Sequence, residues 1–113
     1  MSKYIKNIID INGVRYDILI GKNSFGNEEI INLMKNVNEN SIWFHFETIS
    51  SPHIILDNKE DVINKKNLKK VGMLLYKHKK NVPKNEKIIY TKVKNLKLTN
   101  SPGEVIPETF SYL

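Results

Sequence analysis

The sequence contains no cysteine and no long apolar run. Without cysteine there is no disulfide framework, no thiol nucleophile and no cysteine-based zinc or iron–sulfur site. This absence also fits a reducing compartment such as the cytoplasm, where we expect the protein to act. Hydrophobic residues make up 40% and charged residues 27% of the 113 residues, which is typical of a globular protein. The length predicts one domain over residues 1–113.

Membrane and secretion signals are also lacking. No apolar stretch approaches the roughly 20 residues that span a bilayer. The segment from Met1 to Lys6 has neither a long apolar stretch nor a small-residue cleavage site, so we expect no secretory signal. The sequence therefore predicts a soluble intracellular protein without a transmembrane segment.

Motifs of common enzymes are missing as well. There is no glycine-rich phosphate loop, nucleophile elbow or metal-binding helix pattern. The best remaining candidates are His45 and His53, with Glu47 and Asp57 nearby. If their strands pair, the two imidazoles come close together, and a small metal-dependent nuclease is one interpretation. Otherwise they are hydrogen-bonded strand-end histidines or phosphate contacts. We expect no catalytic residue, no metal, no cofactor and no enzymatic activity.

Positive charge is concentrated in one part of the chain. The net charge is +6, and an AT-rich genome alone would enrich lysine, asparagine and isoleucine. However, residues 65–97 hold 12 lysines and one acid, Glu86, whereas residues 1–64 carry a net charge of −3. This field favours a polyanionic partner, a nucleic acid or an anionic membrane. The alternative is a solvated helix face followed by a basic loop.

A β-hairpin is the clearest local prediction. Asn12-Gly13 separates two alternating runs of β-branched residues, which predicts strands near 3–11 and 14–20. Residues 21–24 then break the pattern as a loop.

Two helices are predicted. Asn27 is expected to cap the first, with acidic residues at 28–29 in its first turn. The second is expected to run from Asp61 or Asn64 to Lys80. At helical spacing, its apolar face holds Leu68, Val71, Gly72 and Leu75, and the opposite face holds Lys66, Lys70, Met73, Lys77 and Lys80.

The remaining elements are strands. They are expected at 42–46, 53–56 and 88–93, with a last edge strand over 104–112 that is interrupted at Pro107. Strands and helices do not alternate regularly, which favours an α+β fold over a doubly wound one. We expect a mainly antiparallel sheet of five or six strands with two helices packed on it.

Aromatic residues cluster in the strand at 42–46. Trp43, Phe44 and Phe46 are a possible base-stacking platform, although we expect core packing for both phenylalanines. Alternation places Trp43 and His45 on one face of the strand and the two phenylalanines on the other. Both faces are then apolar, as in a central strand that is covered by a helix.

Several short motifs, taken in order, resemble a known family. They are Gly21-Lys22-Asn23, Asn27-Glu28, Ile42-Trp43-Phe44-His45, Ser51-Pro52-His53-Ile54, Ile89-Tyr90-Thr91, Val93-Lys94 and Gly103-Glu104-Val105. Together they resemble the NFACT-R domain over roughly residues 14–106. Ser41 departs from the aspartate that the family often has there, and residues 76–79 replace a serine-lysine-alanine-arginine ending of the long helix. The basic character of that ending is retained.

The resemblance implies an RNA-binding module. Family members such as bacterial RqcH and eukaryotic NEMF act in ribosome-associated quality control, where this domain is similar to an RNA-contacting clamp beside a larger N-terminal domain. The Ser50-Ser51 step looks more like short eukaryotic members. We therefore expect a stand-alone form that binds tRNA or ribosomal RNA, at the ribosome or with a partner chain that supplies the larger domain. DNA, an acidic protein and an anionic membrane are the alternative partners.

The expected contact residues fall into two groups. Phosphates are assigned to a lysine stripe: Lys66, Lys70, Lys77, Lys80 and Lys94. A more shape-specific site is assigned to Lys22, Asn23, His45 and His53. There the loop would turn backbone N–H groups toward an anion, and histidines titrating near pH 6.5 would strengthen phosphate binding as the pH falls. The alternative is that both rings are neutral, buried and structural.

Overall fold

The predicted hairpin is present. β1 (Tyr4–Ile11) and β2 (Val14–Gly21) pair antiparallel along their whole lengths. At the turn, Asn12 and Gly13 have φ angles of 53° and 83°. These are the left-handed conformations of a type I′ turn, which asparagine and glycine adopt at low cost. The Asn-Gly prediction is confirmed.

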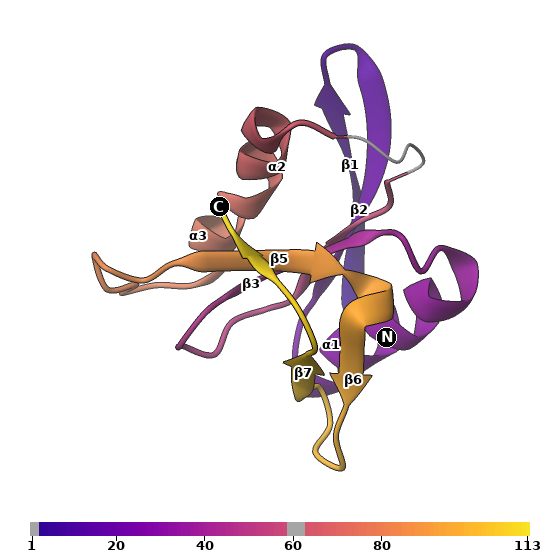
Figure 1. The fold of residues 1–113 in the computed structure, drawn as a ribbon, viewed down its shortest axis with the longest axis vertical. Helices are drawn as coiled ribbons and strands as arrows, with labels where there is room; N and C mark the ends of the chain where they lie inside the picture. Colours follow the sequence, from indigo (N-terminus) through magenta and orange to yellow (C-terminus); the bar gives the residue numbers. More distant parts are fainter. Residues whose placement is uncertain (1–2, 59–62) are drawn as a thin grey trace.

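Six strands form one antiparallel sheet in the computed structural model, which describes residues 3–58 and 63–113. The strand order is β1-β2-β4-β3-β5-β8, and a separate two-stranded sheet pairs β6 with β7 (Figure 1). The α+β prediction is confirmed. The remaining strands are β3 (Ile42–Phe46), β4 (Ile54–Leu56), β5 (Ile88–Lys92), β6 (Leu96–Leu98), β7 (Val105–Pro107) and β8 (Ser111–Tyr112).

Helices cover both faces of the main sheet. On one face, α1 (Ser24–Val37) buries its apolar side in a cluster that includes Trp43. On the other face, α2 (Lys65–Gly72) and α3 (Leu75–His78) pack on a cluster that includes two fully buried residues of β3, Phe44 and Phe46. Burial of each phenylalanine stabilises the fold by about 1.5–3 kcal/mol. The predicted alternation along β3 and the core role of both phenylalanines are confirmed.

The first helix begins earlier than predicted. Asn23 has an extended backbone, and its Oδ1 accepts a hydrogen bond from the N–H of Gly26 at 2.9 Å, so Asn23 is the N-cap. The predicted cap at Asn27 is therefore wrong, because Asn27 lies inside the helix. Since α1 starts at Ser24, the acidic residues at 28–29 lie beyond its first turn.

The predicted second helix is divided. Asn64 caps α2, as expected for one of the two predicted starts, and the other start, Asp61, lies outside the described residues. After Gly72 several backbone hydrogen bonds change to the tighter pattern in which an N–H donates three residues back. The short α3 then ends at His78. A continuous helix to Lys80 is therefore wrong.

The C-terminal strands also differ from the prediction. The single interrupted strand over 104–112 is two strands in different sheets: β7 pairs with β6, which was not predicted, and β8 pairs with β5. Pro107 is the last residue of β7, although the N–H of Glu108 still donates to the carbonyl of Asn95 at 2.8 Å. Val93 lies in the 3-10 turn η1 (Val93–Asn95) rather than in β5, and β4 begins at Ile54, one residue later than expected.

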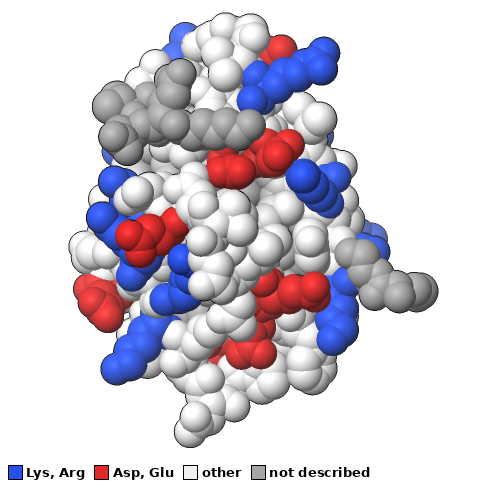
Figure 2. All heavy atoms as spheres, turned by 90° about the vertical axis from the view of Figure 1, so that its right-hand side faces the viewer, with Lys and Arg blue, Asp and Glu red and all other residues white. Residues whose placement is uncertain are grey.

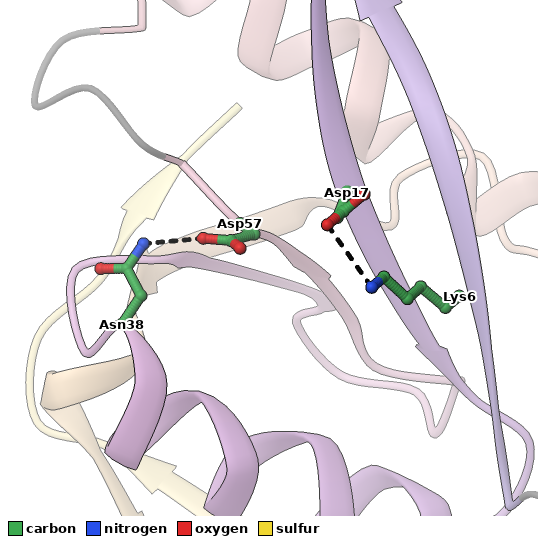
Figure 3. A network of polar contacts seen from close by, with 4 residues as sticks. All are labelled: Lys6, Asp17, Asn38 and Asp57. Atoms are coloured by element: carbon green, nitrogen blue, oxygen red, sulfur yellow. Dashed lines mark hydrogen bonds and ion pairs between the residues drawn. The ribbon is translucent and has the colours of Figure 1, made fainter.

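Polar contacts connect α1 to the sheet. Asn38, at the C-terminal end of α1, donates through Nδ2 to Asp57 Oδ1 and to the carbonyl of Asn58, both at 2.9 Å (Figure 3). In the hairpin, Lys6 Nζ lies 3.6 Å from Asp17 Oδ2. This ion pair is largely exposed and contributes at most about 1 kcal/mol.

Candidate nucleic-acid interface

The two histidines of the predicted site lie together. His45 on β3 and His53, just before β4, have ring centroids 4.8 Å apart on the α1 face of the sheet. The ring of His45 is parallel to that of Trp43 at 5.5 Å, and His53 meets the same indole edge-on. The expectation that strand pairing brings both imidazoles together is confirmed.

His53 is held as a neutral ring. Its Nδ1 accepts a hydrogen bond from Trp43 Nε1 at 3.1 Å, which places the ring proton on Nε2. Its backbone N–H donates to Asn27 Oδ1 at 3.0 Å. Only 4% of the residue is exposed, and this burial, together with the neighbouring His45, lowers its pKa from 6.5 to about 3. The expectation that His53 titrates near pH 6.5 is wrong.

His45 is less buried but follows the same trend. Burial lowers its pKa, and the nearby carbonyls of Phe46 and Ser51 and the carboxylate of Glu86 offset part of that effect. Its Nδ1 donates to the carbonyl of Phe46 at 2.5 Å. The expectation that His45 titrates near pH 6.5 is therefore also corrected to a lower pKa. Both rings are neutral at physiological pH, as in the structural alternative.

Both histidines line a groove of about 480 Å³. Its floor includes Trp43 and Ile89 from the sheet, and Asn27 lines it from α1. The turn between β6 and β7 closes one side. Gly103 in this turn has a φ of 75°, and a Cβ there would lie 2.4 Å from the carbonyl oxygen of Ser24. Glycine therefore lets the turn pack directly on the first residue of α1.

Two backbone N–H groups of the loop before α1 are bonded within the fold. The N–H of Gly21 donates to the carbonyl of His53, and that of Lys22 donates to the carbonyl of Lys3, both at 3.0 Å. A third N–H, that of Gly26, donates to the side chain of the N-cap residue Asn23. These groups stabilise the fold and are not turned toward a ligand, while an anion site at this loop stays a prediction.

The lysine stripe lies away from the histidines. Lys66 and Lys70 are exposed on α2, Lys77 is exposed on α3, and Lys80 follows α3. These helices pack on the phenylalanine face of β3, whereas His45 lies on the Trp43 face. The sheet therefore separates these four lysines from the two histidines. Their roles in nucleic-acid binding stay predictions.

The other predicted contacts lie near α1. Lys22 and Asn23 are exposed at its N-terminal end. Lys94 is exposed in η1, where its backbone N–H donates to the carbonyl of Glu39 at 2.9 Å. Figure 2 shows the right-hand face of Figure 1, on which basic and acidic side chains are interspersed without a continuous basic patch. A basic surface is therefore not visible on that side.

Within residues 3–58 and 63–113, no three histidine, aspartate or glutamate side chains are grouped in a way that would hold a metal ion. In the same described part of the chain, no helix is long and apolar enough to cross a membrane.

Comparisons with known proteins identify the family. The sequence model of the NFACT protein RNA binding domain matches residues 4–110. The chain belongs to the NFACT-R family. A search of curated proteins found no match. Among solved structures, the chain is similar to the C-terminal part of the fibronectin/fibrinogen-binding protein from Streptococcus suis, with a TM-score of 0.80 and 21% sequence identity. The match covers 100% of this chain and 45% of that one, and at this identity it shows a shared fold.

Sequence reasoning missed the role of Asn27 in this NFACT-R domain. Its side chain fixes the backbone of His53, and a Cβ at Gly21 would lie 1.9 Å from its Oδ1. Glycine at position 21 is therefore needed for Asn27 to reach His53. Two groove residues, Glu104 and Phe110, were also missed because they come from the C-terminal segment, which was predicted as one interrupted edge strand and not as two strands in different sheets.

Proposed function

We propose that this NFACT-R domain binds structured RNA, either tRNA or ribosomal RNA, in translation or ribosome-associated quality control, and that it catalyses no reaction. The observation that carries this proposal is the family match over residues 4–110, because that family is described as an RNA binding domain. The concentration of lysine in residues 65–97 independently supports a polyanionic partner.

The phosphate contacts are assigned to a lysine surface on α2, on α3 and in the segment that follows. We define this surface as Lys66, Lys70, Lys77 and Lys80, with Lys94 as a further contact. All five residues are exposed, so a phosphate can approach them without disturbing the core. Each contact releases counterions from the nucleic acid, and the affinity therefore falls as salt rises. Such contacts carry no sequence information, so this surface selects for charge and shape.

The second group of proposed contacts is Lys22, Asn23, His45 and His53. Because the histidines lie on the opposite face of the sheet from α2 and α3, one RNA must bend around an edge of the domain to reach both groups. A folded RNA can contact two sides of a small domain at once, whereas a short straight duplex cannot. This geometry supports tRNA or ribosomal RNA over duplex DNA.

The test is a charge reversal with a matched control. The variant carries Lys66→Glu, Lys70→Glu and Lys77→Glu, and the control carries Lys3→Glu, Arg15→Glu and Lys97→Glu, which make the same change in net charge elsewhere. Binding to labelled tRNA is measured by fluorescence anisotropy at about 0.15 M salt. Loss of three phosphate contacts predicts a decrease in affinity on the order of 100-fold.

The control is expected to lose less than about 10-fold, since only long-range attraction changes. Equal losses in the two variants would contradict the lysine surface. Equal affinity of the wild type for tRNA and for duplex DNA would contradict the RNA assignment. Binding to anionic vesicles without binding to RNA would favour the membrane alternative.

A further inference from the structure

The groove beside His45 and His53 differs chemically from the lysine surface. No lysine or arginine is among the described residues that line it, whereas two carboxylates, Glu47 and Glu104, are. Both histidines are neutral at physiological pH because burial lowers their pKa values. A phosphate in this groove would meet two negative charges and no positive one. The groove is therefore unsuited to the anionic part of a nucleotide.

One buried donor faces the groove. His53 is 4% exposed, and its Nδ1 is already bonded to Trp43 Nε1, so the remaining ring proton is on Nε2. Nε2 has no hydrogen-bond partner among the described residues. Among these residues, only Ser41 Oγ is a side-chain polar atom that is both fully buried and without a partner, so Nε2 is not fully buried. This N–H must therefore open toward the groove. Asn27 and Trp43 hold the ring from both sides, which fixes the direction of the donor.

The remaining lining is mostly apolar. Ile89 comes from β5 of the main sheet, and Val105, Pro107 and Phe110 come from the C-terminal segment. Phe110 is 40% exposed, so a flat ligand can contact its ring without the loss of core packing. The volume of about 480 Å³ lies within the range of small-molecule sites. The groove thus offers apolar walls, one oriented neutral donor and two carboxylates. A flat heteroaromatic ring that carries both an acceptor and an amino group matches these features.

We infer that this groove binds a single unstacked nucleobase of the RNA. This inference rests on the proposed RNA-binding function and adds the chemical group that the histidine site recognises. The base ring lies against Phe110 and Val105, and a ring nitrogen or carbonyl oxygen of the base accepts the Nε2 proton of His53. An amino group on the base can donate to Glu104. Sequence-specific recognition of RNA commonly uses unstacked bases in this way.

The first test uses probes that separate base from phosphate. The side-chain N–H of Trp43, the sole tryptophan, gives a single indole resonance in a ¹H–¹⁵N spectrum and is bonded to His53. Uncharged adenosine, guanosine or cytidine at millimolar concentration is expected to shift this resonance, and inorganic phosphate is not. A shift with phosphate and none with any nucleoside would overturn the inference.

The second test uses two variants and a matched control. Phe110→Ala removes a ring from the groove wall, and His53→Asn removes the Nε2 donor while its Oδ1 replaces Nδ1 as an acceptor. Ile106→Ala is the control, since Ile106 is 55% exposed on β7, between the groove residues Val105 and Pro107, but does not line the groove. Affinity is measured for a single-stranded RNA and for a duplex RNA of equal length. Loss of one stacked base predicts a decrease of about 5- to 100-fold for the single strand with Phe110→Ala.

The duplex has no unstacked base, so its affinity should change less than about 2-fold in all three variants. Equal effects on both RNAs, or no effect on the single strand, would refute the groove as a base site. If the wild-type protein binds neither RNA but the nucleosides still shift the Trp43 resonance, the proposed function fails while the groove still binds bases. If the wild-type protein binds both RNAs, but no nucleoside shifts the resonance and no variant changes the affinity, the groove inference fails while the proposed function stands.

Discussion

Acid is expected to destabilise the domain through His53. In the unfolded chain this ring has a pKa near 6.5, whereas burial lowers its pKa to about 3 in the folded protein. Between these values the unfolded state binds more protons than the folded state, so the free energy of unfolding rises with pH. The destabilisation is absent above about pH 6.5, grows as the pH falls and is complete below about pH 3.

The size of this effect follows from the two pKa values. At pH 5 the ring is almost fully protonated in the unfolded chain and almost fully neutral in the folded one. Proton linkage then lowers the free energy of unfolding by about 2 kcal/mol relative to pH 7.5. This is a large fraction of the 5–15 kcal/mol that is typical of small domains. The effect is therefore measurable by denaturant titration.

The assay compares the wild type with His53→Asn. Asparagine does not titrate in this range, and its Oδ1 can accept the hydrogen bond from Trp43 Nε1. Urea unfolding is followed by the fluorescence of Trp43 from pH 7.5 to pH 5. The stability of the wild type should fall by about 2 kcal/mol more than that of the variant. His78→Asn, on an exposed residue of α3, is the control and should keep the acid sensitivity of the wild type. Parallel pH curves for the wild type and His53→Asn would refute the reasoning.

Two further predictions concern the fold and the absence of chemistry. Gly26→Ala is expected to destabilise the protein by about 1–3 kcal/mol in urea unfolding, because the new Cβ would lie 1.8 Å from the backbone oxygen of Lys3. The gain in helix propensity is at most about 1 kcal/mol and does not offset this clash. A stabilised variant would show that the close contact is absent. Labelled RNA incubated with the protein and magnesium or manganese is expected to stay intact. Cleavage that disappears in both His45→Ala and His53→Ala would instead favour the nuclease interpretation.

Local signals predicted the parts of the fold that depend on neighbouring residues. Asn12-Gly13 specifies a turn through the backbone conformations that these two residues adopt easily. Alternation along β3 separated Trp43 from Phe44 correctly because side chains in a strand point to opposite faces. The approach of His45 to His53 followed from strand pairing alone.

Features that depend on tertiary contacts were not predictable in this way. Asn23 and Asn27 are equally good caps, and the choice between them depends on the contact of Asn27 with His53, 26 residues away. The break after Gly72 did not interrupt the apolar pattern, so periodicity alone predicted one continuous helix. The neutral state of His53 follows from its burial and from the neighbouring His45, which are tertiary features, so residue type alone left the charged and the neutral ring open.

The salt dependence of tRNA binding tests the central claim most directly. The affinity of the wild type and of the Lys66→Glu, Lys70→Glu, Lys77→Glu variant is measured by anisotropy between about 0.05 and 0.3 M potassium chloride. If four to six lysines contact phosphates, the logarithm of the association constant falls against the logarithm of the salt concentration with a slope of about −3 to −5. In the variant the slope should become shallower by about 3. A flat dependence in the wild type, or an unchanged slope in the variant, would contradict binding through the lysine surface.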